Sequence, residues 1–284
     1  MSSYESNGAL LHFERTGQGL PVVFLHPTPF HHGYWGPLMA AFPEVLCIAP
    51  DLRGHGASPL LGTGQHLPVG EFQRVPDAPA LTMDQLAADI LRMMDAAEID
   101  QAAFVGCSIG GYILLELWRR APERMSALAF ICSKPQPDTE AALVQRLQTI
   151  ERIRVEGAQR VQDGMVHSLV GDSSQRQRPA IVAELRSQMT LDAEALIAVQ
   201  AGLAIRPDSR LTVATLSVPV LAIAGGEDKV CPLAEMQAFT GAPGGCEMHL
   251  LPEAGHLAAY ERPEAVAALV APWLLRIGGS RRRR

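Results

Sequence analysis

The segment AAFVGCSIGGYILLELW, residues 102–118, decides how this chain folds. An apolar, strand-like run ends at Gly106 and a helix-like run begins near Ile109, with Ser108 on the corner between them. The pattern Gly-x-Ser-x-Gly between a strand and a helix is typical of a nucleophile elbow, whose serine projects from the carboxyl edge of a sheet. A serine that caps a helix after a glycine turn is the alternative, and the strand before Ser108 favours the nucleophile.

Short β-like runs alternate with helix-like runs along the chain. We expect strands at 9–17, 22–26, 44–51, 102–106, 125–132, 218–226 and 246–252. We expect helices at 31–42, 83–99, 109–120, near 232–239 and near 262–276. Strands that alternate with helices indicate a mostly parallel sheet flanked by helices, so the sequence predicts an α/β fold.

Two segments interrupt this alternation. Residues 57–81 are rich in glycine and proline and are long for a strand-to-helix connection, which is common in functional loops. Residues 134–210 contain no convincing strand, and their helix-like pieces lie at 139–154, 158–170, 179–189 and 192–205. We therefore expect an all-helical lid at 134–210, inserted into a core formed by residues 1–133 and 211–278.

Composition and charge restrict the possible functions. The chain has 284 residues, 48% of them hydrophobic, which is enough apolar material for a full core, and its formal net charge is −6. The basic residues are scattered except at Arg281–Arg284, so we expect no nucleic-acid surface and a disordered tail at 279–284. The N-terminus carries no secretory pattern, and no apolar run is long enough to span a bilayer.

Cysteine and histidine usage gives no sign of a metal site. The chain has five cysteines without CxxC spacing, at Cys47, Cys107, Cys132, Cys231 and Cys246. Such a dispersed, odd set predicts reduced thiols in a cytoplasmic protein. His31 and His32 are adjacent, and adjacent histidines rarely face one metal ion without acidic partners nearby. We therefore expect no metal.

Further motifs occur in a fixed order along the chain: VVFLHPTP, DLRGHGAS, GCSIGG, AGGEDKVCP and LPEAGHLAAYERPE. In this order they resemble the α/β-hydrolase family over nearly the whole chain. The segment from the elbow to the next strand is most similar to the carboxylesterase and enol-lactonase branch. The resemblance implies an α/β-hydrolase fold with a helical lid, and a serine hydrolase that uses no cofactor.

The family places its catalytic residues in the chain order nucleophile, acid, histidine. The resemblance implies that Ser108 is the nucleophile, that Asp228 in GGEDKVCP is the acid, and that His256 in PEAGH is the base. Glu227 and Asp138 remain rival acids. Of the nine histidines, His256 is the one that follows a strand in the last position that the chain order demands.

The resemblance also implies two main-chain donors for the oxyanion that forms during catalysis. One is the N–H of Ile109, at the start of the helix after the elbow. The other comes from an earlier loop, where Pro27 has no N–H and Thr28 occupies the donor position, with its hydroxyl as a further candidate. Phe30 and Trp35 follow this loop and are candidates for lining an acyl pocket, with packing of the next helix as an equal alternative.

Together these residues predict a serine hydrolase that cleaves a small or medium carboxylic ester or lactone through an acyl-enzyme. A peptidase or amidase, a C–C hydrolase and a perhydrolase are alternatives on the same triad, because a fold does not select the bond that is cleaved. A ligand receptor with slow turnover is an alternative from another class. The expected partner is a small-molecule ester or lactone, without nucleic acid or membrane, and the sequence leaves the oligomeric state open.

Overall fold

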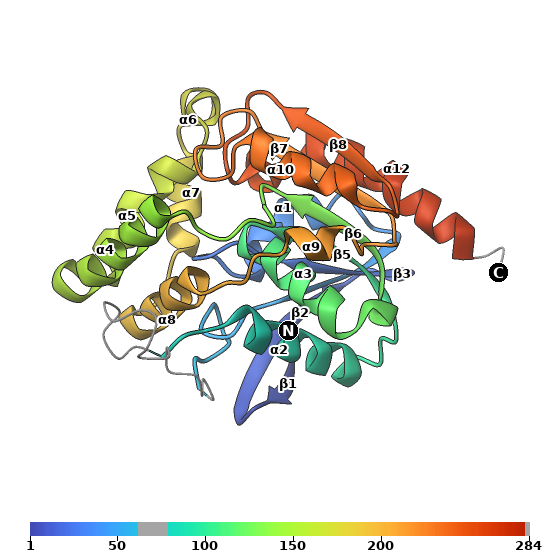
Figure 1. The fold of residues 1–284 in the computed structure, drawn as a ribbon, viewed down its shortest axis with the longest axis horizontal. Coiled ribbons are helices and arrows are strands. Elements are labelled where there is room, and N and C mark those ends of the chain that lie inside the picture. Colours follow the sequence, from blue (N-terminus) through green and yellow to red (C-terminus); the bar gives the residue numbers. More distant parts are fainter. Residues whose placement is uncertain (62–78, 282–284) are drawn as a thin grey trace.

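The architecture comes from a computed structural model, which describes residues 1–61 and 79–281. One sheet runs through the molecule (Figure 1). Its strands are β1 Ser2–Ser6, β2 Ala9–Thr16, β3 Leu20–Leu25, β4 Val45–Pro50, β5 Ala102–Cys107, β6 Met125–Ile131, β7 Val220–Gly225 and β8 Cys246–Leu251. Most of the predicted connection 57–81, namely residues 62–78, lies outside the described residues.

The strands lie in the order β1-β2-β4-β3-β5-β6-β7-β8. The pairs β1–β2 and β2–β4 are antiparallel, and the other pairs are parallel. The predicted mostly parallel sheet is therefore confirmed, and each expected strand is present. Because the carboxyl ends of parallel strands share one edge, the loops after β3, β5, β7 and β8 meet there.

Helices connect the strands and cover the sheet. The α-helices are α1 Gly36–Met39, α2 Met83–Ala96, α3 Ile109–Arg120, α4 Glu140–Glu156, α5 Ala158–Leu169, α6 Asp172–Gln177, α7 Ile181–Gln188, α8 Ala193–Ala204, α9 Arg210–Val213, α10 Leu233–Met236, α11 Ala258–Glu261 and α12 Pro263–Arg281. Short 3₁₀ segments cover His32–Trp35, Pro122–Arg124 and Gln237–Gly241.

The sheet separates two apolar layers, because successive residues of a strand point to opposite faces. In β7, Val220 and Ala222 pack into one layer while Leu221 and Ile223 pack into the other. Helices α2 and α3 close the first layer, and α1 and α12 close the second. The core strands are thus buried on both faces, which explains why they are almost continuously apolar.

Strand β1 is an element that the sequence analysis did not predict. It forms a hairpin with β2 in which Ser6 pairs with Ala9. The two-residue turn between them is Asn7-Gly8, with φ of 43° and 73°. An Asn-Gly pair suits such a turn because both positions need positive φ. The turn residues were therefore the available signal, although the strand SSYES itself is too polar to stand out.

The chain between β6 and β7 is helical wherever it has regular structure, from α4 to α9. The four helices expected between 134 and 210 are present as α4, α5, α7 and α8, and α6 is a further short helix. In Figure 1 these helices form one group beside the sheet. That this group acts as a lid stays a prediction.

Helix α12 extends further than the sequence predicts. It runs through Pro272 to Arg281, so residues 279–281 belong to the helix rather than to a tail, and residues 282–284 lie outside the described part. Glycine weakens a helix by about 1 kcal/mol without forbidding it, and the pair in IGGS therefore does not end α12. Among the described helices, none combines the length and apolar content needed to cross a bilayer.

Candidate active site

Ser108 stands between β5 and α3 with φ of 52° and ψ of −117°. Positive φ is uncommon for a residue with a side chain, so the surroundings must fix this corner. A Cβ at Gly106 would lie 2.6 Å from the carbonyl carbon of Gly110, and a Cβ at Gly110 would lie 2.2 Å from the main-chain oxygen of Leu25. Close backbone approach therefore requires the glycines on both sides of the serine.

Asp228 and His256 follow β7 and β8 and reach the same edge of the sheet as Ser108. Nδ1 of His256 lies 2.8 Å from Oδ2 of Asp228. An ionised carboxylate can only accept, so Nδ1 carries the hydrogen and Nε2 is left as the basic nitrogen. Both residues are buried, with 7% of Asp228 and 3% of His256 exposed.

The surroundings of Asp228 favour its ionised form. Burial raises the pKa of this carboxyl, but the charge of His256, the hydrogen bond from its ring and main-chain donors outweigh burial and hold the pKa below its ordinary value. The main-chain donors are the N–H groups of Val230 and Cys231, at 2.7 and 2.9 Å from Oδ1. A carboxylate held in this way orients an imidazole and stabilises its charged form.

Ser108 precedes the first turn of α3, where the main-chain N–H groups have no partner within the helix. The N–H of Ile109 is one of these groups, and the helix dipole adds partial positive charge there. Sγ of Cys107, the residue before the serine, lies 3.7 Å from the main-chain oxygen of His256. The elbow (residues 106–110) and the loop 252–257 that carries His256, here called the histidine loop, are therefore in direct contact.

Thr28 lies in the loop after β3, and its Oγ1 is 3.0 Å from Nε2 of His55. Nδ1 of His55 is 3.0 Å from the main-chain oxygen of Arg53, which can only accept. Burial lowers the pKa of His55 to about 4, so the ring is neutral and Nε2 accepts the Thr28 hydroxyl hydrogen. The hydroxyl is engaged in this bond, which leaves the main-chain N–H of Thr28 as the candidate oxyanion donor.

Phe30 and Trp35, the candidates for an acyl pocket, are fully buried. The ring centroid of Trp35 lies 5.4 Å from Phe24 and 4.9 Å from Tyr34. The ring of Phe30 lies 5.7 Å from Tyr34. Packing, which the sequence left open for both residues, accounts for these contacts, and contact with a substrate stays a prediction.

Two buried thiols lie beside the pair formed by Asp228 and His256. Burial raises the pKa of Cys107 to about 12 and raises the pKa of Cys132 well above its ordinary value. Both thiols are therefore protonated near neutral pH and are poor nucleophiles. Cys132, Asp228 and His256 have potential metal-binding atoms within 4.8 Å of one another. The carboxylate of Asp228 in this group is hydrogen-bonded to His256 and to the N–H groups of Val230 and Cys231, and we assign the group no metal.

A second group with metal-binding atoms within 4.8 Å consists of His31, His32 and Asp51. The fold thus supplies the acidic partner that the sequence did not reveal beside the two histidines. Oδ1 of Asp51 accepts from the main-chain N–H and from Nδ1 of His32, both at 2.8 Å. Oδ2 accepts from the N–H of Ala57 at 2.9 Å. These bonds use the carboxylate to hold two loops, and we assign the group this structural role.

The two rival acids bind other partners. Oδ2 of Asp138 lies 2.7 Å from Arg146, and its Oδ1 lies 2.6 Å from Arg206. The carboxylate of Glu227 binds Ser173 of α6. Asp228 is thus the carboxylate that the structure pairs with His256.

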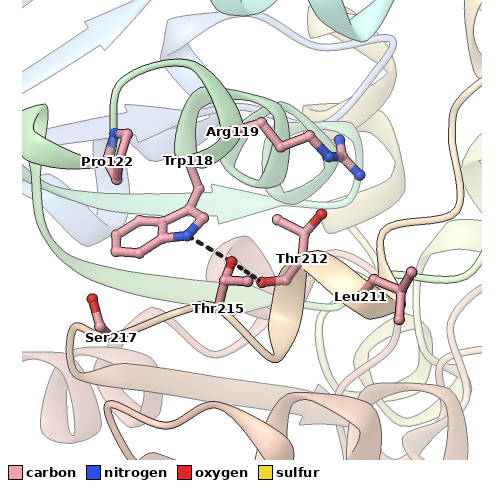
Figure 2. Close-up of a pocket in the computed structure, with 7 residues that line it drawn as sticks. All are labelled: Trp118, Arg119, Pro122, Leu211, Thr212, Thr215 and Ser217. Atoms are coloured by element: carbon pink, nitrogen blue, oxygen red, sulfur yellow. Dashed lines mark hydrogen bonds between the residues drawn. The ribbon is translucent and has the colours of Figure 1, made fainter.

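A pocket of about 550 Å³ lies apart from these residues, and Figure 2 shows the side chains that line it. It is lined by Trp118, Arg119, Pro122, Leu211, Thr212, Thr215 and Ser217. Nε1 of Trp118 donates to Oγ1 of Thr215 at 3.0 Å, and that hydroxyl donates to the main-chain oxygen of Thr212 at 2.7 Å. Trp118 follows Ser108 by ten residues on α3, so a rise of 1.5 Å per residue puts it about 15 Å along the helix from the elbow. The cavity is therefore separate from the candidate active site.

Glu261 is a residue near the candidate site that the sequence did not single out. Glu261, five residues after His256, is 1% exposed and contacts the histidine loop. The available signal was a single carboxyl group in the otherwise apolar run LAAYE.

Known proteins resemble this chain over most of its length. Residues 22–269 match the model of the alpha/beta hydrolase family. The chain is 28% identical over 248 residues to 3-oxoadipate enol-lactonase 2 of Acinetobacter baylyi, which covers 86% of this chain and 84% of that protein. It is 30% identical over 241 residues to a pimeloyl-[acyl-carrier protein] methyl ester esterase of Xanthomonas campestris pv. campestris, with 80% and 84% covered. A solved thermophilic esterase from Thermogutta terrifontis has a TM-score of 0.85 at 28% identity, with 98% of both chains covered.

The chain therefore belongs to the alpha/beta hydrolase family. The family resemblance and the α/β-hydrolase fold that the sequence indicated are confirmed. Similar proteins that include an enol-lactonase and an esterase agree with the branch that the elbow segment resembles.

Proposed function

We propose that this chain is a serine hydrolase that cleaves a small or medium carboxylic ester or lactone, with Ser108, Asp228 and His256 as its triad. The main support is the 2.8 Å contact between Nδ1 of His256 and Oδ2 of Asp228, together with a serine held at φ of 52° at the same edge of the sheet. This pairing leaves Nε2 to activate an alcohol nucleophile.

In the first half of the reaction, Nε2 of His256 takes the hydroxyl proton as Oγ of Ser108 attacks the carbonyl carbon. The carbonyl oxygen becomes an oxyanion, which the N–H groups of Ile109 and Thr28 bind. The C–O bond to the leaving alcohol then breaks, and His256 donates its proton to that alcohol. The acyl group remains on Ser108.

In the second half, His256 takes a proton from water as the water oxygen attacks the acyl carbon. The bond to Oγ of Ser108 breaks, the serine recovers its proton from His256, and the free acid leaves. For a lactone, the alcohol and the acid remain parts of one molecule.

The relatives support the substrate class. One is an enol-lactonase and another is a methyl ester esterase, at 28% and 30% identity. Because the same triad serves amide and C–C hydrolysis and perhydrolysis, the bond itself has to be tested.

The helical insertion at 134–210 is the proposed lid, which would shape the acyl pocket and exclude water. It contacts the proposed base directly, because the main-chain N–H of His256 donates to the oxygen of Leu169 at 2.8 Å. Such contact between the insertion and the histidine loop supports a place for these helices over the site.

A fluorophosphonate probe tests the nucleophile. We expect intact-mass analysis to show one adduct on the parent chain and none on Ser108→Ala. A panel of esters and lactones graded by acyl length, with amide and C–C substrates beside them, then identifies the bond.

The negative outcomes are distinct. No adduct on a folded parent would contradict an activated serine and favour the receptor with slow turnover. An adduct with hydrolysis of amides or C–C bonds alone would keep the triad and overturn the ester or lactone assignment.

A further inference from the structure

The carboxylate of Glu261 is buried next to the loop that carries His256. Its Oε1 accepts from the N–H of Gly255 at 3.0 Å and from the N–H of Leu257 at 3.1 Å. Its Oε2 accepts from Gly255 at 3.0 Å and from the N–H of Gly171 at 3.0 Å. All three donors are main-chain groups, so the carboxylate binds backbone at three places.

Burying a carboxylate is costly unless donors or a paired cation compensate for the lost water. Within the described residues, Arg178 and Arg262 contact this residue, and both bind the main-chain oxygen of Glu261 rather than its carboxylate. The compensation that the structure shows for the carboxylate comes from backbone N–H groups, which themselves need acceptors when buried. The contacts of Glu261 therefore serve to hold chain segments in place.

The held backbone lies on both sides of the proposed base. Gly255 precedes His256 and Leu257 follows it. The carbonyl groups of this stretch are held as well, since Sγ of Cys132 lies 3.5 Å from the oxygen of Gly255 and Sγ of Cys107 lies 3.7 Å from the oxygen of His256. With its flanking peptides fixed, the Cα–Cβ bond of His256 has a fixed direction, from which the imidazole reaches Asp228.

The third donor belongs to the helical insertion. Gly171 lies between α5 and α6, close to Leu169, whose oxygen accepts from the N–H of His256. A Cβ at Gly255 would lie 2.3 Å from the nitrogen of Gly171, so the two segments approach as closely as only glycine allows. One side chain, Glu261, therefore binds both the histidine loop and the insertion.

We propose that Glu261 is a positioning residue for His256. By binding the N–H groups around the base, it holds the ring so that Nδ1 faces Asp228, and it docks the insertion on the same loop. This inference rests on the proposed function, because it needs His256 to be the base. Loss of the carboxylate leaves every atom of the triad in place but misaligns the base that acts in the transition state, so we expect the main effect on kcat.

The test compares Glu261→Gln with Glu264→Gln, the same change at an exposed position in the first turn of α12. Glutamine keeps the shape of the side chain but turns an NH₂ group toward N–H donors. For Glu261→Gln we expect kcat to fall about 10- to 100-fold with little change in KM. We also expect the low-field proton resonance of the His256–Asp228 hydrogen bond to weaken. Glu264→Gln should match the parent in both measurements.

A purely structural Glu261 would lower the melting temperature while leaving kcat and the resonance as in the parent, and that result would overturn the inference. If Glu261→Gln does not fold, Glu261→Asp, which keeps both oxygens on a shorter side chain, takes its place with the same expectations. A parent chain without turnover would count against the proposed function instead. The resonance needs no substrate and would still test the positioning of His256.

Discussion

Glu227 and Asp228 are consecutive in the chain, yet their carboxylates bind different parts of the molecule. Oδ2 of Asp228 lies 2.8 Å from Nδ1 of His256. Oε1 and Oε2 of Glu227 lie 2.5 and 2.7 Å from Oγ and the main-chain nitrogen of Ser173. The turn after β7 therefore directs one acid to the proposed base and its neighbour to helix α6.

Asp228→Asn and Glu227→Gln should separate these two roles. Asparagine can donate to Nδ1 of His256 and so favours the wrong tautomer, and we expect kcat/KM to fall by about 10³- to 10⁴-fold. We expect Glu227→Gln to stay within about threefold of the parent, because its carboxylate does not touch the imidazole. Steady-state kinetics on the best ester measures both. Equal losses in the two variants would contradict the assignment of Asp228.

Thr28→Val tests the hydroxyl that binds Nε2 of His55. Valine keeps the shape and the main-chain N–H, so the proposed oxyanion donor survives and turnover should change less than about fivefold. Loss of a working oxyanion donor costs about 10²- to 10³-fold in kcat, and a drop of that size would make the hydroxyl itself a donor. Unfolding in urea should show a loss of about 1 kcal/mol for the broken hydrogen bond.

His55 should make the fold less stable in mild acid. Burial lowers its pKa from 6.5 to about 4. Between pH 6.5 and pH 4 the ring is therefore protonated in the unfolded chain but neutral in the folded chain. The contribution of this ring to the free energy of unfolding is fully present above pH 6.5. It falls by on the order of 3 kcal/mol as the pH drops toward 4. His26 acts in the same direction, because burial and the charge of His55 lower its pKa to about 3.

His55→Gln is the matching variant. It should be less stable than the parent at pH 7, because the bonds to Thr28 and Arg53 are disturbed, and its stability should depend less on pH between 6.5 and 4. Urea unfolding at several pH values measures the slope. Parallel curves for variant and parent would show that His55 does not cause the dependence.

Two glycine-to-alanine changes compare a crowded position with an open one. A Cβ at Gly110 would lie 2.2 Å from the main-chain oxygen of Leu25, whereas a Cβ at Gly164 in α5 has no neighbour within 4 Å. We expect Gly110→Ala to lower the free energy of unfolding by about 2–4 kcal/mol. We expect Gly164→Ala to raise it by about 0.5–1 kcal/mol, as alanine does in a helix. Denaturant midpoints of both variants and the parent measure these changes. A Gly110→Ala variant as stable as the parent would contradict the requirement for close backbone approach.

The sequence predicted the sheet, and with it the edge on which the candidate residues lie, because both follow from local patterns. Ser108 lies in a five-residue motif between a strand and a helix, and His256 follows the last strand. The sequence leaves Glu227 as a rival of Asp228, because both acids follow β7 and the turn determines where each side chain points. Main-chain bonds in that turn, from Glu227 to Ala254 and from Asp228 to Gly225, set this direction.

Contacts between segments that are far apart in the chain could not be predicted from the sequence. Asp51 contacts His32 because β3 and β4 are neighbours in the sheet. The residues next to either one in the sequence give no signal of this contact. Glu261 is similar, since its partner Gly171 lies 90 residues earlier. In the sequence, a buried glutamate or aspartate cannot be distinguished from an exposed one, because its hydrogen-bond donors come from distant segments.

The position of the histidine loop in the chain determines when the candidate site can assemble during synthesis. It follows the helical insertion in the chain, and its contacts with Leu169 and Gly171 need that insertion to be in place. While the polypeptide leaves the ribosome, domains fold from the N-terminal side, and Ser108 emerges well before His256. On the proposed function, a nascent chain thus carries Ser108 as an ordinary alcohol, and the proposed triad is complete only after β8 and α11 have been translated.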